Sequence, residues 1–182
     1  MIDFWHAIAM LRLDRPLGLA EVQTCFAGGK AAEGLVGFRR ARLIATTCGY
    51  GVDGPLEAMA RMWMPWRGQH FSRQAAEGAN LFTVGGRRAI RTVFPRYRGL
   101  GDDEEGTSAF RFVTSIAPSV SHPGVTVLRL DYRGVGENPS FPVRRMVDEL
   151  VQIDDDLCLG QALMTGGGRP HRVAWFSLEP VT

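Results

Sequence analysis

Apolar residues recur every three or four positions through the first thirty residues, which is the spacing of one helix face. The first series runs over residues 4–11, and Pro16 interrupts it. A second series follows and stops at Gly28 and Gly29, a pair that suits a helix end. We therefore expect a helical N-terminal segment, residues 1–30, that contains two short helices.

From residue 35 onward apolar and polar positions alternate, which is typical of strands that bury one face. Gly85 and Gly86 suit a two-residue hairpin turn between strands 81–84 and 88–94. We also expect a helix at residues 55–62, where a proline and an acid mark its start, and an exposed acidic loop at 99–108. Further strands are expected over residues 35–47, 110–116, 125–132, 146–153, 157–163 and 171–178.

Seven or eight consecutive strands with short turns must avoid a long exposed edge, and closure into a barrel achieves this. The sequence therefore predicts a mainly β fold: an antiparallel meander over residues 35–182 that closes into a barrel of about eight strands. A β-sandwich of two sheets is the alternative. No linker or repeat divides the chain, so we expect one domain over residues 1–182.

Composition and charge argue against several classes of protein. The chain has 182 residues, is 45% hydrophobic and 22% charged, and carries a net charge of +2, which gives no reason to expect nucleic acid as a partner. The apolar run near the N-terminus is too short for a membrane span and lacks the flanks of a signal peptide. We expect a cytoplasmic protein with no membrane insertion.

Standard catalytic and cofactor motifs are absent from the sequence. It contains no phosphate-binding P-loop, no His-Glu-x-x-His metal motif and no Gly-x-Ser-x-Gly nucleophile elbow. The four histidines are scattered, and the three cysteines form no Cys-x-x-Cys pair. We therefore predict neither a metal nor a cofactor.

The segment from Trp63 to Phe71 is a candidate binding site. Trp63, Trp66 and Arg67 would supply the apolar walls and directed polar group of a small-molecule pocket. The alternative is that the two tryptophans only fill the core, with the arginine stacked on one of them. His70 is a candidate general base, although a lone histidine is more often a structural hydrogen-bonding group.

Two arginine- and tyrosine-containing segments form a second candidate site. Arg96 and Tyr97 lie in one, and Asp131, Tyr132 and Arg133 form the other. If both segments lie at one barrel mouth, they could orient an anionic head group while the interior holds an apolar tail. Surface salt bridges are the alternative explanation.

Residues 146–153 fit either a helix with Met146 and Leu150 on one face or a strand with Val147, Glu149 and Val151 on one face. The acidic triplet at 154–156 resembles a turn and favours the strand. Glu149 would then point to the core side, where desolvation raises the pKa of a carboxyl group and makes it a candidate acid or base. In a helix, or in the other strand register, it would face water.

The order of an N-terminal helical segment followed by a β meander resembles that of the lipocalin-like (calycin) barrels. That family opens its first strand with Gly-x-Trp, and the nearest segments here, 34–36 and 37–39, lack the tryptophan. Residues 53–58, 130–134, Asp148, 154–156 and 159–160 are similar to bacterial domains named for a Gly-x-Trp-x-Gly motif, whose function is unknown. This second resemblance implies a compact β domain and no catalytic residue that could be carried over.

We expect the barrel to bind one small, largely apolar molecule, with a carboxylate as one option for its head group. An alternative is a cofactor-independent cyclase or isomerase that uses Glu149 or His70 as its acid/base residue. A second alternative is a module that binds a protein partner or itself, and a homodimer is compatible with the sequence.

Overall fold

The computed structural model describes residues 3–47, 65–74, 76–166 and 168–181. Trp63 and the helix expected at 55–62 lie outside these ranges. None of the helices in the described ranges is long and apolar enough to cross a membrane.

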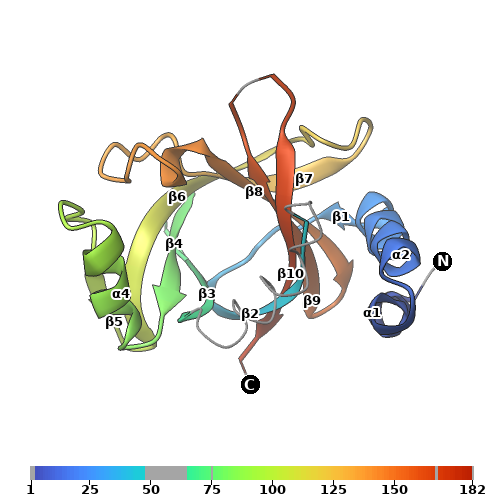
Figure 1. Cartoon of the computed structure of the whole chain (residues 1–182), viewed down its shortest axis with the longest axis horizontal. Coiled ribbons are helices and arrows are strands. Elements are labelled where there is room, and N and C mark those ends of the chain that lie inside the picture. The colour runs from blue at the N-terminus through green and yellow to red at the C-terminus, as the bar shows by residue number, and fades with distance from the viewer. Residues whose placement is uncertain (1–2, 48–64, 75, 167, 182) are drawn as a thin grey trace.

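The fold is a closed antiparallel barrel, and its eight strands curl round a central axis in Figure 1. The strands follow the order β8-β7-β6-β4-β3-β2-β10-β9, and pairing of β9 with β8 closes the circle. The barrel strands are β2 (Gly37–Thr46), β3 (Trp66–Phe71), β4 (Glu77–Phe82), β6 (Gly106–Pro118), β7 (Thr126–Asp131), β8 (Met146–Asp154), β9 (Leu157–Met164) and β10 (His171–Pro180). The prediction of a mainly β barrel with short helices is confirmed.

Two short strands extend the sheet, and short helices flank the barrel. The strands are β1 (Lys30–Ala31), which pairs with β8, and β5 (Gly101–Asp103), which pairs with β6. The helices are α1 (Phe4–Leu13), α2 (Arg15–Gly28), α4 (Gly86–Val93) and the 3-10 turn η1 (Val143–Arg145).

The two N-terminal helices, α1 and α2, form as the sequence predicts and cover one side of the barrel (Figure 1). The side chains of Asp3 and Asp14 cap them, because they accept hydrogen bonds from the backbone N–H groups of Trp5 and Leu17, both at 3.1 Å. Phe26 of α2 packs against Trp175 of β10, with ring centroids 5.3 Å apart. Phe26 and Trp175 belong to a hydrophobic cluster between these helices and the outside of the barrel. The barrel wall is therefore buried on its outer face here as well as on its inner face.

Both faces of β8 are consequently buried. Its even-numbered residue Leu150 belongs to the cluster inside the barrel, together with Leu130 and Phe176, whereas Val151 belongs to the cluster beneath α1 and α2. Successive side chains of a strand point to opposite faces. The interior of the barrel is therefore lined by the even-numbered residues of β8.

The prediction of a hairpin around Gly85 and Gly86 is wrong. The strand β4 ends at Phe82, and the segment after the glycines forms α4. Within α4, Ile90 is buried beside Phe82, whereas Arg88 and Arg91 are exposed. A helix lying on the barrel buries the one apolar side of this segment and leaves its arginines in water. This favours a helix over the strand that the alternating pattern predicts.

The prediction of an acidic loop at 99–108 is also wrong, because these residues form the hairpin of β5 with the start of β6. Asp103 pairs with Gly106 across a turn at residues 104 and 105. Gly106 has φ of +142°, and a Cβ atom there would lie 2.2 Å from the carbonyl oxygen of Phe82. Glycine therefore allows the start of β6 to lie close to the end of β4.

Candidate functional site

A pocket of about 310 Å³ lies inside the barrel. Every barrel strand contributes to its lining, either directly or, for β7, through Tyr132 immediately after the strand. The described residues that line it are Leu43, Trp66, Asn80, Phe82, Phe110, Tyr132, Pro142, Val143, Met146, Asp148, Ala162, Ala174 and Phe176. We call it the lumen pocket. It is mostly apolar and aromatic, with a few polar groups on one side, as in pockets that bind small molecules.

Asp148 of β8 is the carboxylate of the lumen pocket, and its residue is 6% exposed. Its Oδ2 accepts two hydrogen bonds, one from the Tyr132 hydroxyl at 2.7 Å and one from Gln69 Nε2 at 3.1 Å. Among the described residues, no group donates to Oδ1. The carboxylate is therefore held by one oxygen, and the other is available to a bound molecule.

The direction of the hydrogen bonds around Asp148 follows from Trp66. Its indole Nε1–H can only donate, and it donates to Asn80 Oδ1 at 2.9 Å. The amide nitrogen of Asn80 must then donate to the Tyr132 hydroxyl oxygen, at 2.9 Å. The Tyr132 proton is thereby directed to Asp148 Oδ2.

This arrangement decides where Asp148 carries a proton. Because Oδ2 already accepts two donors, a proton on the carboxyl group sits on Oδ1, the oxygen left for the pocket. Burial raises the pKa of Asp148 to about 7, and the hydrogen bonds from Tyr132 and Gln69 lower it in part. Burial, followed by the nearby Asp148 charge, also raises the pKa of Tyr132 well above its usual value, so the phenol keeps its proton at neutral pH.

A β-bulge on β6 places Phe110 at the lumen pocket. The register between β4 and β6 shifts at this point, and Phe110 has φ of +50°, which is rare for a residue other than glycine. Its N–H donates to the Tyr97 hydroxyl at 2.7 Å, and its carbonyl accepts from Asn80 Nδ2 at 3.1 Å. These two bonds replace the ladder bonds lost at the bulge.

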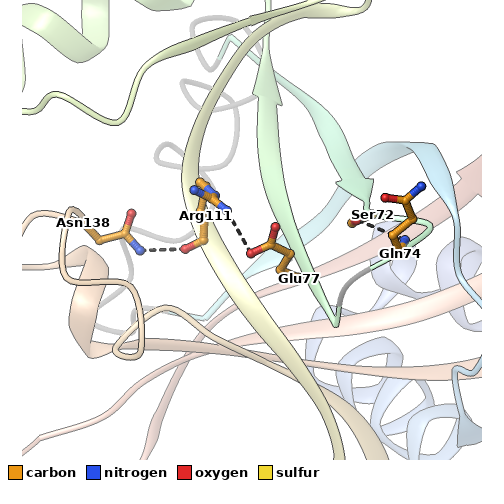
Figure 2. Close-up of polar contacts among 5 residues, drawn as sticks. All are labelled: Ser72, Gln74, Glu77, Arg111 and Asn138. Carbon is orange, nitrogen blue, oxygen red and sulfur yellow. Dashed lines mark hydrogen bonds and ion pairs between the residues drawn. The ribbon is translucent and has the colours of Figure 1, made fainter.

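The loop after Tyr132 is bonded both to the Tyr132 backbone and to β6. The buried Asn138 donates from Nδ2 to the carbonyl oxygens of Tyr132, at 3.0 Å, and of Arg111, at 2.7 Å. Figure 2 shows the contact of Asn138 with Arg111 beside the ion pair of Arg111 with Glu77, in which Nη2 and Oε2 are 2.8 Å apart. The loop is thus attached to β6, and the Tyr132 phenol is held toward the interior.

Two of the predicted site residues line the lumen pocket, namely Trp66 and Tyr132. Arg67 instead lies outside, where it contacts the Glu105 carbonyl and stacks over the Phe38 ring at 5.5 Å. His70 is half-buried and alternates with Gln69, which places it on the outer face of β3.

The other predicted residues with polar side chains lie away from the lumen pocket. Arg96 and Arg133 are exposed. Tyr97 packs its ring on Phe110, with centroids 5.1 Å apart, and supports the bulge from behind. The Asp131 carboxylate accepts from the Arg133 N–H at 2.7 Å, on the outer face of β7. The two segments therefore do not converge on one site.

Glu149 is fully buried on the outer face of the barrel wall, not in the lumen. Its carboxylate accepts from Ser119 Oγ at 2.6 Å, from the Val120 N–H at 2.7 Å and from Gln161 Nε2 at 2.8 Å. Gln161 in turn accepts from Arg172 Nε at 2.7 Å. Three donors and a linked guanidinium satisfy the buried charge, and they fasten the β6–β7 connection to the wall.

The sequence reasoning missed Asp148, Gln69 and Asn80 as site residues. It took one face of β8 as the core, although both faces are covered, so the odd-numbered apolar residues gave no information about the lumen. A signal for the site was available in the sequence. Gln69, Asn80 and Asp148 are single polar residues, each in a strand whose other residues on the same face are mostly apolar.

A second cavity of about 580 Å³ lies between α1 and the wall formed by β2 and β10. Its lining includes Trp5, Arg12, Arg15 and Arg42, and Leu43 and Trp66 border both cavities. A buried hydrogen-bonded network with an available carboxylate oxygen is found at the lumen pocket. The lumen pocket is therefore the stronger candidate site.

Comparisons with known proteins identify the fold and no more. The sequence matches no model of a known protein family and no curated protein. Among solved structures, a crystal structure of a protein from Thermomonospora curvata is similar, with a TM-score of 0.53 over 98% of each chain and 12% sequence identity. The chain therefore shares its whole-chain architecture with that bacterial protein.

Proposed function

We propose that the barrel binds one small, largely apolar molecule in the lumen pocket. The observation that supports this most strongly is the pocket itself, which has a volume of about 310 Å³ and a mostly apolar lining to which all eight strands contribute, β7 through Tyr132 just after it. Pockets of this size and character accommodate drug-sized molecules. A polar group on the ligand would meet Asp148 Oδ1, and this makes Asp148, rather than Glu149 or His70, the polar anchor.

The proposal is tested by filling the pocket from one side. Ala162 lies on β9 at the pocket wall, and Ala162→Leu would occupy part of the space that a ligand needs. The matched control is Ala89→Leu, an exposed alanine on α4.

The neutral dye N-phenyl-1-naphthylamine, which fluoresces strongly in apolar surroundings, serves as the probe. We expect saturable fluorescence with the wild type and with Ala89→Leu, and at least about a tenfold weaker affinity with Ala162→Leu. Equal binding by all three proteins, or none by the wild type, would contradict the proposal. Native mass spectrometry of freshly purified protein looks for a co-purifying ligand independently.

Proton transfer is a second candidate function, favoured by the availability of Asp148 Oδ1. An ionised carboxylate with one accessible oxygen can take a proton from a bound carbon acid, and the carboxylic acid so formed can return it at a neighbouring carbon, which is the chemistry of an isomerase. We would follow deuterium exchange at the α-carbons of 2-octanone in D2O by NMR. Exchange that Asp148→Asn slows and Asp131→Asn does not would support this function, and equal rates would exclude it for this ketone.

A further inference from the structure

We propose that the lumen pocket selects apolar molecules that carry a protonated amine, with the ammonium paired to Asp148 Oδ1 and resting against the aromatic wall. This inference rests on the binding function proposed above, because it names the head group of the ligand. It replaces the carboxylate head group considered from the sequence.

The first argument is charge. Among the described residues that line the pocket there is no arginine, lysine or histidine, and Asp148 is the carboxylate. An ionised carboxylate in an apolar pocket is costly without an opposite charge. Oδ1 has no partner among the described residues, so a ligand that brings its own cation completes the pair.

The second argument is the orientation of the carboxylate. The donors Tyr132 and Gln69 both bind Oδ2, and Asn80 fixes the Tyr132 hydroxyl in turn. These bonds stabilise the ionised form and hold the group in one position before a ligand arrives. Their common effect is to present Oδ1, with its negative charge, to the pocket.

The third argument is the aromatic lining. Five of the described residues that border the same space are aromatic: Trp66, Phe82, Phe110, Tyr132 and Phe176. The Trp66 and Phe176 rings meet edge to face at 5.4 Å, and the Phe82 and Phe110 rings at 5.7 Å. Faces of aromatic rings attract cations, most strongly away from water, and a carboxylate with aromatic walls is the usual chemistry of amine recognition.

The same features disfavour the other head groups. A carboxylate ligand would meet the like charge of Asp148, and none of the lining residues that the structure describes is an arginine that could offset it. An alcohol could hydrogen-bond to Oδ1 but would leave the charge without a counter-ion. Selectivity should therefore follow the order amine, alcohol, carboxylate for a common apolar tail.

The test compares octylamine, 1-octanol and octanoate by isothermal titration calorimetry at pH 8, where the alkylamine is protonated. With the wild type we expect octylamine to bind at least about tenfold more tightly than 1-octanol, and octanoate more weakly than either. With Asp148→Asn, octylamine and 1-octanol should bind within about threefold of each other. Asp131→Asn, the same change on the outer face of β7, should keep the wild-type order.

The outcomes separate the two proposals. Binding of none of the three compounds would overturn the binding function and this inference with it. Equal binding of octylamine and 1-octanol by the wild type, or preference for octanoate, would overturn the inference and leave the pocket as a binding site. The wild-type comparison stands even if Asp148→Asn fails to fold, which circular dichroism would reveal.

Discussion

The Tyr132 hydroxyl donates to Asp148 Oδ2 across 2.7 Å, and it is itself fixed by Asn80. This pair is the centre of the polar side of the barrel interior. It connects the residue just after β7 with one near the start of β8, and it determines which carboxylate oxygen a ligand can reach. Four predictions concern this pair and the carboxylate next to it in the sequence.

The first prediction concerns Asp148→Asn and the dependence of stability on pH. Burial raises the pKa of Asp148 to about 7 in the folded protein, above the value of about 3.9 for an unfolded chain. Its contribution to stability is therefore fully present below about pH 4 and is lost as the pH rises through 7. Asparagine stays neutral, accepts the Tyr132 and Gln69 hydrogen bonds, and avoids this loss.

We expect Asp148→Asn to raise the free energy of unfolding at pH 8 by a few kcal/mol relative to wild type, and to leave it nearly unchanged at pH 4. Urea unfolding at the two pH values measures the difference, with Asp131→Asn as the control. A variant less stable than wild type at pH 8 would refute the assignment of a buried charge to Asp148.

The second prediction concerns Tyr132→Phe. The Tyr132 hydrogen bond lowers the pKa of Asp148, so its removal should raise that pKa above about 7. We also expect a loss of stability of about 1–2 kcal/mol, because Oδ2 loses one of its two donors. The Asp148 carboxyl pKa is measured by carbon-13 NMR titration. Tyr97→Phe, which removes a phenol hydroxyl behind the bulge, should leave that pKa unchanged, and an equal shift in both variants would be inconsistent with the prediction.

The third prediction concerns Glu149→Gln. All three contacts of the Glu149 carboxylate are with donors, so an amide nitrogen in its place must face a donor. We expect destabilisation by about 1–3 kcal/mol, with wild-type octylamine binding in the folded protein. Glu77→Gln at the exposed ion pair with Arg111 should cost less than about 1 kcal/mol. Loss of octylamine binding in Glu149→Gln would mean that its role is not confined to the outer face.

The fourth prediction is the pH dependence of ligand binding. If octylamine pairs with ionised Asp148, its affinity should rise as the pH increases through the pKa of about 7. A single carboxyl group with this pKa implies a gain on the order of thirtyfold between pH 5.5 and pH 8, whereas 1-octanol should show little change. Calorimetry at several pH values measures both. A flat profile for octylamine would show that the Asp148 charge is not involved.

The barrel could be predicted from the sequence because its late strands alternate clearly. Strands β8, β9 and β10 lie where they are predicted, and the N-terminal helices follow their apolar spacing and aspartate caps. The prediction failed at α4 and β5, where short segments pack on the outside of the barrel. Their structure depends on contacts with β4 and β6 that local pattern does not contain.

The candidate site could be predicted only in part. Trp66 and Tyr132 combine a large apolar body with a polar tip, and that residue type was enough to select them. Asp148 was passed over in favour of its neighbour Glu149, since α2 and the β6–β7 connection bury the outer face of β8 as completely as the lumen. A shift of one residue exchanges the two faces of a strand, so two adjacent buried carboxylates cannot be told apart without the fold.

The most direct test of binding in the lumen follows the indole N–H signals of the tryptophans by nitrogen-15 NMR. Trp66 borders both the lumen pocket and the outer cavity, Trp5 borders only the outer one of these two, and Trp175 packs against Phe26 of α2. During titration with octylamine, and with 1-octanol as its neutral counterpart, the Trp66 signal should shift saturably while those of Trp5 and Trp175 stay in place. A Trp66 signal unmoved by either compound, or equal shifts of all three, would contradict binding inside the barrel.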